Sequence, residues 1–287
     1  MVVPRREGEI HPATTACGAL TLARGTSRKG WSPSAGSKVE RNVDLPLGVK
    51  SVDDKGTDRQ PLLALDVTDE ASVAACVGAI EARHGRLDVL VNNAGTVVAT
   101  WAKATRAEDA EAQMATNFFG AVRMVRACVP LMTGEMRRVI NIGSVGGRIG
   151  LPYQSMYSAS KAAVMVWTDA LRMEAWESGV KVSLVEPGDL KPGMVNASKA
   201  EGFDDEPVAT GAFDIMRKEE ANGTDPTKVV NVVLKSLRTD APAGRYLVGP
   251  DAWEVELLSR LIPHAVKEYI LAAHYRVPPR HNAWFRI

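Results

Sequence analysis

Tyr157 and Lys161 are the two residues of this chain whose types and spacing most directly indicate chemistry. Residues four apart on a helix share a face, so the phenol and the ammonium group would project into the same space. A free phenol has a pKa of about 10, and a cation held beside it favours the phenolate and lowers that pKa toward neutrality. Ser144 lies thirteen residues before Tyr157 and adds a neutral hydroxyl donor. Together the three side chains indicate proton exchange with a carbonyl or alcohol oxygen.

The elements that must position these side chains alternate between strand and helix from Pro61 onward, which predicts a mostly parallel sheet with helices on both faces. Ser144 follows a predicted strand, so its hydroxyl would lie at the carboxyl end of the sheet, where open α/β sheets bind ligands. Tyr157 and Lys161 lie on the predicted helix that comes next. The predicted strands are 62–66, 87–91, 139–142, 180–185 and 245–249. The predicted helices are 69–84, 110–132, 155–177, one beginning at 224–226, and one helix or a pair of helices within 251–275, interrupted at Pro263.

Three further motifs stand in order with these residues, namely Asn92-Asn-Ala-Gly95, Asn117 and Pro187-Gly188. Together with the three side chains above, they resemble the short-chain dehydrogenase/reductase family, and the resemblance covers roughly residues 61–249. It implies a Rossmann-like, doubly wound α/β fold in a single domain. It also implies an NAD(P)-dependent oxidoreductase that interconverts a secondary alcohol and a carbonyl by hydride transfer. Within the family, the chain looks most like retinol, steroid and hydroxybutyrate dehydrogenases.

The resemblance also implies roles for the site residues. Tyr157 would be the general acid or base, Lys161 would lower its pKa and hold the nicotinamide ribose, and Ser144 would hydrogen-bond the reacting oxygen. Asn117 would support proton supply through a water that links the lysine to solvent. The residues that would bind NAD or NADP are Asp66, Val67, Asn93, Ala94, Gly95, Tyr157, Lys161, Pro187 and Gly188.

Each of these assignments has a structural alternative that the sequence leaves open. Tyr157 and Lys161 could form an ordinary solvated pair on a helix surface, and Ser144 could cap the turn that follows it. Asn117 interrupts an apolar helix face and could make a purely structural hydrogen bond. Asp66 could be a helix cap instead of a contact to the adenine ring.

Residues 1–60 depart from the family pattern and are rich in Arg, Gly, Ser, Pro and Thr. In the family, this region supplies the first strand and a Gly-x-x-x-Gly-x-Gly turn whose amides bind the pyrophosphate. The nearest candidate here begins at Gly25, and Lys29 and Trp31 occupy the positions of the later glycines. We therefore predict a divergent N-terminal segment over 1–60, poorly ordered or a degenerate first βαβ unit, followed by the catalytic core over 61–287.

This departure leaves two alternatives open. The chain could be a catalytically silent member of the family with a binding or regulatory role. The segment could also reflect a GC-rich coding region read in the wrong frame, in which case the natural protein has an intact glycine motif. The strand that decides between NAD and NADP in relatives is not identifiable within the segment, so both cofactors remain open.

Residues 189–223 are polar and long for a connection inside a compact domain, which predicts a substrate loop. Pro192 lies where relatives often have a threonine that binds the carboxamide of the cofactor. Since proline has neither a hydroxyl nor an amide donor, we expect this contact to be lost or moved to Ser198 or Asn196.

Composition argues against several functional classes. The formal net charge of +1 does not favour nucleic acid as a partner. No apolar run reaches about 18 residues and no secretory signal is evident, so we expect no membrane span. The separated cysteines Cys17, Cys76 and Cys128 suit reduced thiols in a cytoplasmic protein, and no metal-ligand cluster is recognisable. The expected partners are a small-molecule alcohol or carbonyl and, by resemblance, further copies in a homodimer or homotetramer that pairs through 117–132 and 155–177.

Overall fold

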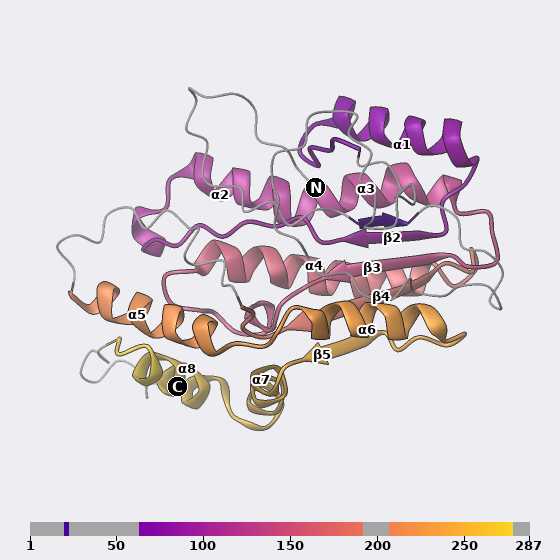
Figure 1. Ribbon diagram of the computed structural model, residues 1–287. Helices are drawn as coiled ribbons and strands as arrows, with labels where there is room; N and C mark the ends of the chain where they lie inside the picture. Colours follow the sequence, from indigo (N-terminus) through magenta and orange to yellow (C-terminus); the bar gives the residue numbers. More distant parts are fainter. Residues whose placement is uncertain (1–19, 23–62, 192–206, 278–287) are drawn as a thin grey trace, which may run out of the picture.

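The computed structural model of the chain describes residues 20–22, 63–191 and 207–277. A five-stranded sheet in the order β1-β2-β3-β4-β5 lies at the centre of these residues (Figure 1). The four strands β2 to β5 run parallel, and only β1 is antiparallel to its neighbour. The predicted mostly parallel sheet is therefore confirmed. The strands are β1 (Leu20–Leu22), β2 (Val89–Asn92), β3 (Arg138–Ile142), β4 (Lys181–Pro187) and β5 (Arg245–Val248).

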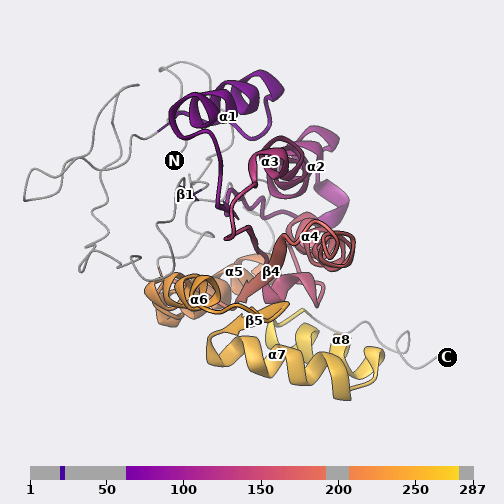
Figure 2. The same cartoon turned by 90° about the vertical axis from the view of Figure 1, so that its right-hand side faces the viewer.

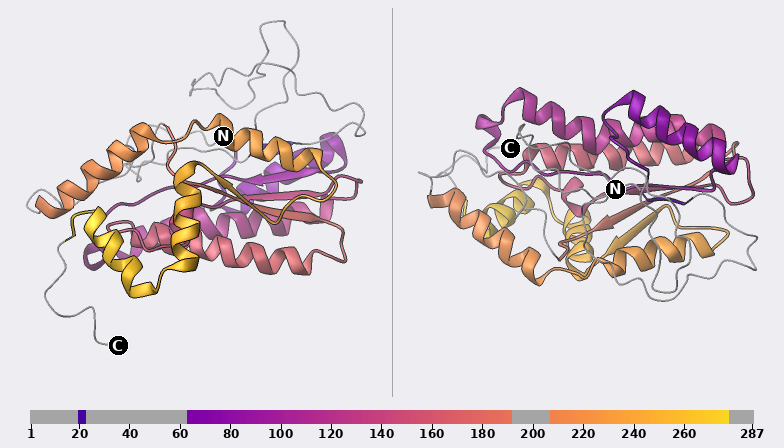
Figure 3. Two further views of the ribbon diagram at one scale, coloured as in Figure 1. Left: turned by 90° about the horizontal axis from the view of Figure 1, so that it is seen from below. Right: turned by 45° about the horizontal axis from the view of Figure 1, so that its top comes forward.

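Helices cover both faces of the sheet, as a doubly wound fold requires. When the sheet is seen from its end, α1, α3 and α4 lie on one side of it and α6 lies on the other, while α7 and α8 lie beyond β5 (Figure 2). Figure 3 shows the same arrangement from below and from an oblique direction. The helices are α1 (Glu70–His84), α2 (Ala107–Met114), α3 (Gly120–Cys128), α4 (Ser155–Glu174), α5 (Pro207–Asn222), α6 (Thr227–Arg238), α7 (Pro250–Leu261) and α8 (His264–His274).

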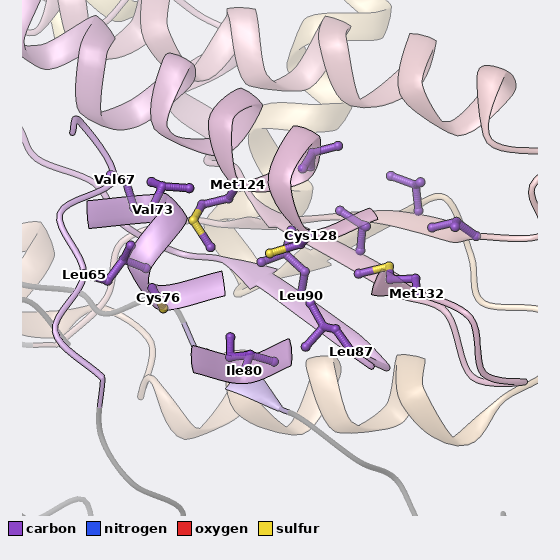
Figure 4. Packing of buried hydrophobic residues seen from close by; sticks show 14 of the residues in the cluster. Leu65, Val67, Val73, Cys76, Ile80, Leu87, Leu90, Met124, Cys128 and Met132 are labelled. Carbon is purple, nitrogen blue, oxygen red and sulfur yellow. The ribbon is translucent and has the colours of Figure 1, made fainter. Parts of the chain in front are cut away.

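The strands alternate their side chains between two apolar cores, because successive residues of a strand point to opposite faces. Leu90, Val139 and Val182 pack toward α1 and α3, and Figure 4 shows this cluster with Met124 and Cys128 from α3. The neighbouring strand residues pack against α6 instead: Val89, Val91, Ile140 and Val185 lie with Val233 and Leu237. β2, β3 and β4 are buried on both faces, which fixes the centre of the sheet and the loops that follow these strands.

The predicted strand at 62–66 is wrong for the residues that the structure describes. Residues 63–66 run without strand pairing into the turn before α1. A strand needs a neighbour for its backbone hydrogen bonds, and β1 occupies the edge of β2. The helix predicted after this segment is confirmed: Asp69 caps it by accepting from the Ala71 amide at 3.0 Å.

The segment predicted as a substrate loop contains a helix, since α5 occupies Pro207–Asn222. Residues 192–206 of that segment, with Pro192, Asn196 and Ser198, lie outside the described residues. Of the predicted N-terminal segment 1–60, only β1 is described, so Gly25, Lys29 and Trp31 also lie outside.

Two expectations of absence concern the membrane and metals. In the described ranges, no helix has the length and apolar character needed to cross a bilayer. Within the same residues, no group of three or more His, Cys, Asp or Glu side chains is arranged to hold a metal ion. Cys76 and Cys128 are buried free thiols. Burial is the larger cause, and the charge of the neighbouring Cys76 the smaller one, that raises the pKa of Cys128 to about 12.

Candidate active site

Ser144 and Tyr157 meet at the carboxyl end of β3. Ser144 comes two residues after that strand and caps the short 3₁₀ helix η4 (Val145–Gly147), where its Oγ accepts from the Gly146 amide at 3.0 Å. Its side chain also hydrogen-bonds to Tyr157, which lies in the first turn of α4. The structural alternative considered for Ser144, a cap of the following turn, is therefore present, and the same hydroxyl group also interacts with Tyr157.

Gly147 sets the distance between these two residues, and sequence reasoning did not single it out. A Cβ atom at Gly147 would lie 2.7 Å from the Lys161 carbonyl carbon and 2.8 Å from its oxygen. The backbone of η4 thus packs directly on the backbone of α4, at the turn that carries Lys161. The Gly146-Gly147 pair in the sequence was the available signal for such a close approach.

Lys161 lies beneath Tyr157 and is only 5% exposed. Its Nζ donates to the Ile142 carbonyl at 3.0 Å and lies 5.9 Å from the centre of the Tyr157 ring. A Cβ atom at Gly95 would be 3.6 Å from this Nζ and 3.6 Å from Asn117 Oδ1. The structure therefore gathers the lysine, the tyrosine, the asparagine and the glycine of the Asn-Asn-Ala-Gly motif in one place, and excludes a solvated pair on the helix surface.

The pKa of Tyr157 is raised above its ordinary value, which contradicts the prediction that it falls toward neutrality. Burial is the largest cause, because it disfavours the charged phenolate. The hydrogen bond with Ser144 acts in the opposite direction, and the negative charges of Asp189 and Glu220 raise the pKa further. Tyr157 is consequently a neutral phenol at pH 7, a form that can donate a proton.

Asn117 lies in a π-helical turn, η2 (Ala115–Phe119), which joins α2 to α3. The predicted single helix over 110–132 is thus four connected segments: α2, η2, α3 and the 3₁₀ helix η3 (Val129–Leu131). π turns occur often at functional sites. Asn117 is 3% exposed and its Oδ1 accepts from the Thr96 amide at 2.8 Å. Its Nδ2 donates to the Thr96 carbonyl at 2.9 Å and to Ser160 Oγ at 2.9 Å. The structural hydrogen bonds considered for this residue are present.

Gln113 supports the same backbone segment and was missed by the sequence reasoning. It is fully buried, and its Nε2 donates to the Thr96 carbonyl at 3.1 Å. It precedes Asn117 by four residues, so both amides reach Thr96 from one face of the helix. A second amide side chain one helical turn before Asn117 was the available signal.

The predicted cofactor residues fall into two groups. Val67 and Ala94 line a small cavity together with Asn92, Asn117 and Asn141. Asp66 is exposed, and its carboxylate accepts from the Thr68 amide at 2.8 Å and from the Thr68 hydroxyl at 2.7 Å, which makes it a turn residue next to the helix cap.

The second group lies after β4. Gly188 donates its amide to the Val248 carbonyl at 3.0 Å. A Cβ at Gly188 would lie 1.7 Å from Asp251 Oδ2, so the space that the missing side chain leaves is filled by the chain's own carboxylate.

The donors of the site fit the ribose end of a nicotinamide cofactor. The Lys161 ammonium and the Tyr157 hydroxyl are hydrogen-bonding groups of the kind that bind sugar hydroxyls. Gly95 has no side chain to fill the space next to the Lys161 ammonium group. The turn that would bind the pyrophosphate falls in residues that the structure does not describe.

A buried ion pair holds the strand that leads to Gly188. Glu186 of β4 is fully buried and accepts two hydrogen bonds from the Arg148 guanidinium, at 2.9 and 2.7 Å. Arg148 also pairs with Glu256 of α7. These contacts tie the loop after Ser144 to β4 and α7.

Comparison with known proteins agrees with this geometry. The family model described as short chain dehydrogenase matches residues 23–202. The chain belongs to the short-chain dehydrogenase family. The match begins inside the segment 1–60 that was predicted to diverge.

Relatives in the family are named as oxidoreductases, and the chain is accordingly an enzyme of that class. It is 36% identical over 237 residues to a 3-ketodihydrosphingosine reductase from Bacteroides thetaiotaomicron, covering 77% of this chain and 88% of the relative. It is 34% identical to Oxidoreductase BOA17 from Botryotinia fuckeliana, covering 69% and 74%.

Solved structures confirm the predicted fold class. A short-chain dehydrogenase from Streptomyces avermitilis aligns with a TM-score of 0.63 at 28% identity, covering 76% of this chain and 79% of that one. A short-chain dehydrogenase/reductase from Burkholderia phymatum, solved in complex with NAD, aligns with a TM-score of 0.58 at 25% identity, covering 68% and 73%.

Proposed function

We propose that the protein interconverts a secondary alcohol and a carbonyl, with Tyr157 as the group that exchanges the proton. The observation that carries this proposal is the closeness of Ser144, Tyr157 and Lys161. A Cβ atom at Gly146 would lie 3.3 Å from both Ser144 Oγ and Tyr157 Cε1, and Lys161 Nζ lies 5.9 Å from the centre of the Tyr157 ring. Two hydroxyl groups at the carboxyl end of a parallel sheet are placed to bind one substrate oxygen. NAD or NADP, when bound, supplies or accepts the hydride. The relative from Burkholderia phymatum, solved with NAD, supports this cofactor class.

In the direction of reduction, each residue has a distinct task. Ser144 donates a hydrogen bond to the substrate carbonyl oxygen and polarises it. Tyr157 donates its proton to the same oxygen as the negative charge develops, and its raised pKa keeps that proton in place at neutral pH. Lys161 stabilises the phenolate that remains, since an adjacent cation favours the charged form, and it holds the ribose. The proton that Tyr157 loses returns from solvent through a water that Asn117 helps to hold beside Lys161.

The substrate is a small molecule, and an apolar cluster holds α5 against the segment before Tyr157. Tyr153 lies four residues before Tyr157 and packs with Trp101 at 5.3 Å and with Phe213 of α5 at 6.0 Å, measured between ring centres. Met216 of α5 belongs to the same apolar cluster. The segment 189–223, which includes α5, is the substrate loop in this proposal. The name of the Bacteroides relative, a reductase of a keto compound, supports the carbonyl class.

The protein works as a homodimer or homotetramer in this proposal. Large apolar side chains remain exposed on the helices that we expect to pair: Val166 at 64%, Met173 at 54% and Trp176, just after α4, at 74%. Exposed apolar patches of this kind are typical of contact surfaces. The buried free thiols Cys76 and Cys128 support the expected cytoplasmic location.

The substitution Tyr157→Phe tests the proposal. It removes the hydroxyl and leaves the ring, so the fold should remain intact while kcat falls by about 10²–10⁴-fold. Tyr269→Phe is the matched control, because Tyr269 is 52% exposed on α8. Steady-state rates and circular dichroism are measured for both variants. Near-normal turnover by a folded Tyr157→Phe protein would rule out the assigned role.

A catalytically silent protein is the second candidate, because Lys29 and Trp31 replace glycines of the pyrophosphate turn. A tryptophan side chain obstructs close backbone approach to a phosphate. Calorimetric titration with NAD(H) and NADP(H) separates the two functions. Micromolar or tighter binding supports the enzyme, and absence of binding to a folded protein supports the silent member.

A further inference from the structure

Three separate parts of the chain come together directly after β4. Thr224, which precedes α6, donates its amide to the Asp189 carbonyl at 2.7 Å and accepts from the Lys191 amide at 3.1 Å. Gly188 donates to the Val248 carbonyl at the end of β5 at 3.0 Å. The exit from β4, the start of α6 and the end of β5 therefore form one connected backbone network at the mouth of the site.

The Asp251 carboxylate lies at the centre of this network. Asp251 is in the first turn of α7, and its Oδ2 accepts from the Asp189 amide at 2.6 Å. A Cβ atom at Gly188 would lie 1.7 Å from this Oδ2, and one at Gly249 would lie 2.5 Å from Oδ1. Gly249 also has a φ of 109°, which disfavours any other residue. Two glycines leave the space that a single carboxylate fills.

We propose that Asp251 is a positioning residue: by holding the Gly188–Asp189 peptide against α7, it fixes where the Asp189 carboxylate stands relative to Tyr157. The proposal rests on the proposed function only for the role of Tyr157. Asp189 is adjacent in sequence to Gly188, and its charge acts on Tyr157, as does that of Glu220. A displacement of the Asp189 peptide therefore changes the electrostatic environment of the proton donor.

The negative charge of Asp251 also affects the pKa of Asp189. Loss of hydration is the largest cause that raises the pKa of Asp189 to about 7, and the charge of Asp251 is the next. Glu219 and Glu220 of α5 raise it further, whereas His274 of α8 lowers it. Asp251 thus both fixes the position of Asp189 and favours its neutral form near pH 7.

Two substitutions separate position from charge. Asp251→Asn keeps an acceptor oxygen for the Asp189 amide and removes the charge, whereas Asp251→Ala removes both. Glu254→Gln and Glu254→Ala are matched controls, because Glu254 is exposed on the same helix. These four variants are compared with the unchanged protein.

Two NMR measurements on these proteins test the proposal independently of turnover. Hydrogen exchange of the Asp189 amide should be at least about 10-fold faster in Asp251→Ala and remain slow in Asp251→Asn, since a hydrogen-bonded amide must open before it exchanges. Titration of the Asp189 carboxyl should shift to lower pH in both Asp251 variants and in neither control.

The functional part of the proposal predicts a difference in kcat. Misplacement by about 1 Å costs up to about 100-fold in rate, so kcat should fall in Asp251→Ala and be largely restored in Asp251→Asn. Unchanged exchange and titration would overturn the positioning role whether or not the enzyme turns over. Normal kcat and KM in a folded Asp251→Ala protein would overturn its link to Tyr157. If the alanine variant fails to fold, the titration of Asp251→Asn still decides.

Discussion

Gly147→Ala should displace the loop that carries Ser144 from the helix that carries Tyr157. The new Cβ would lie 2.7–2.9 Å from three backbone atoms of Lys161 and Ala162, whereas ordinary contacts lie at 3.4–4 Å. All three atoms belong to the backbone of α4 and cannot rotate away as a side chain could. The loop must therefore retreat by about 0.7 Å, a case of overpacking that typically costs about 1–3 kcal/mol.

We expect Gly147→Ala to lower the rate of the reaction more than it lowers the stability of the fold. The expected loss of stability lowers Tm by roughly 2–10 °C, which leaves a folded protein at room temperature. The same shift moves Ser144, which shares one substrate oxygen with Tyr157 in the proposed mechanism. Since misplacement of about 1 Å costs up to about 100-fold in rate, we expect kcat/KM to fall by about 10- to 100-fold.

The assay compares Gly147→Ala with Gly150→Ala by thermal unfolding and steady-state kinetics. Gly150 lies three residues further along the same loop, is exposed, and a Cβ there would meet no atom within 4 Å. The control should retain both stability and activity. Wild-type kcat/KM and Tm in Gly147→Ala would refute the reasoning, because they would show that η4 and α4 do not pack at the distances described.

Two further predictions concern charged side chains. Arg148→Ala should lower the free energy of unfolding in urea by about 3 kcal/mol, because it leaves the fully buried Glu186 without its closest partner. The control Arg106→Ala breaks an exposed pair with Asp109 and should lower it by less than about 1 kcal/mol. Similar losses in the two variants would contradict this. The pKa of Asp189 is raised to about 7. The folded protein therefore keeps a proton on this carboxyl group that the unfolded chain releases near pH 4. The stability that this group contributes should consequently decline as pH rises from about 4 to about 7. Asp189→Asn should therefore increase Tm relative to the unchanged protein at pH 8 and not at pH 4, and an equal difference at both values would count against the assignment.

Local patterns in the sequence were sufficient to predict most of the sheet and its helices. Strands such as 139–142 and 180–185 are short apolar runs bounded by polar residues, and they appear as β3 and β4 with boundaries within two residues at most ends. The pair of helices after Asp251 was indicated by Pro263, which separates α7 from α8. These signals are local, so they predict strands and helices even when the residues that pack against them are unknown.

Features that depend on a distant partner were not predictable in the same way. Residues 62–66 have the composition of a strand, but a strand also needs a neighbour, and the sequence does not state which edge is available. The π turn at Asn117 depends on hydrogen bonds with Thr96 and Ser160, which lie 21 and 43 residues away. The predicted fall in the pKa of Tyr157 considered Lys161 alone, whereas burial and the carboxylates of Asp189 and Glu220 act in the opposite direction.

Three glycines near the site show that one residue type can be present for different structural reasons. Gly147 and Gly188 are needed by the protein itself, since a Cβ would collide with the backbone of α4 in one case and with the Asp251 carboxylate in the other. At Gly95, by contrast, a Cβ would meet Asn117 Oδ1 and Lys161 Nζ at 3.6 Å, which is ordinary contact. The absence of a side chain there keeps space beside the lysine and the asparagine. Packing therefore explains Gly147 and Gly188, and it does not explain Gly95.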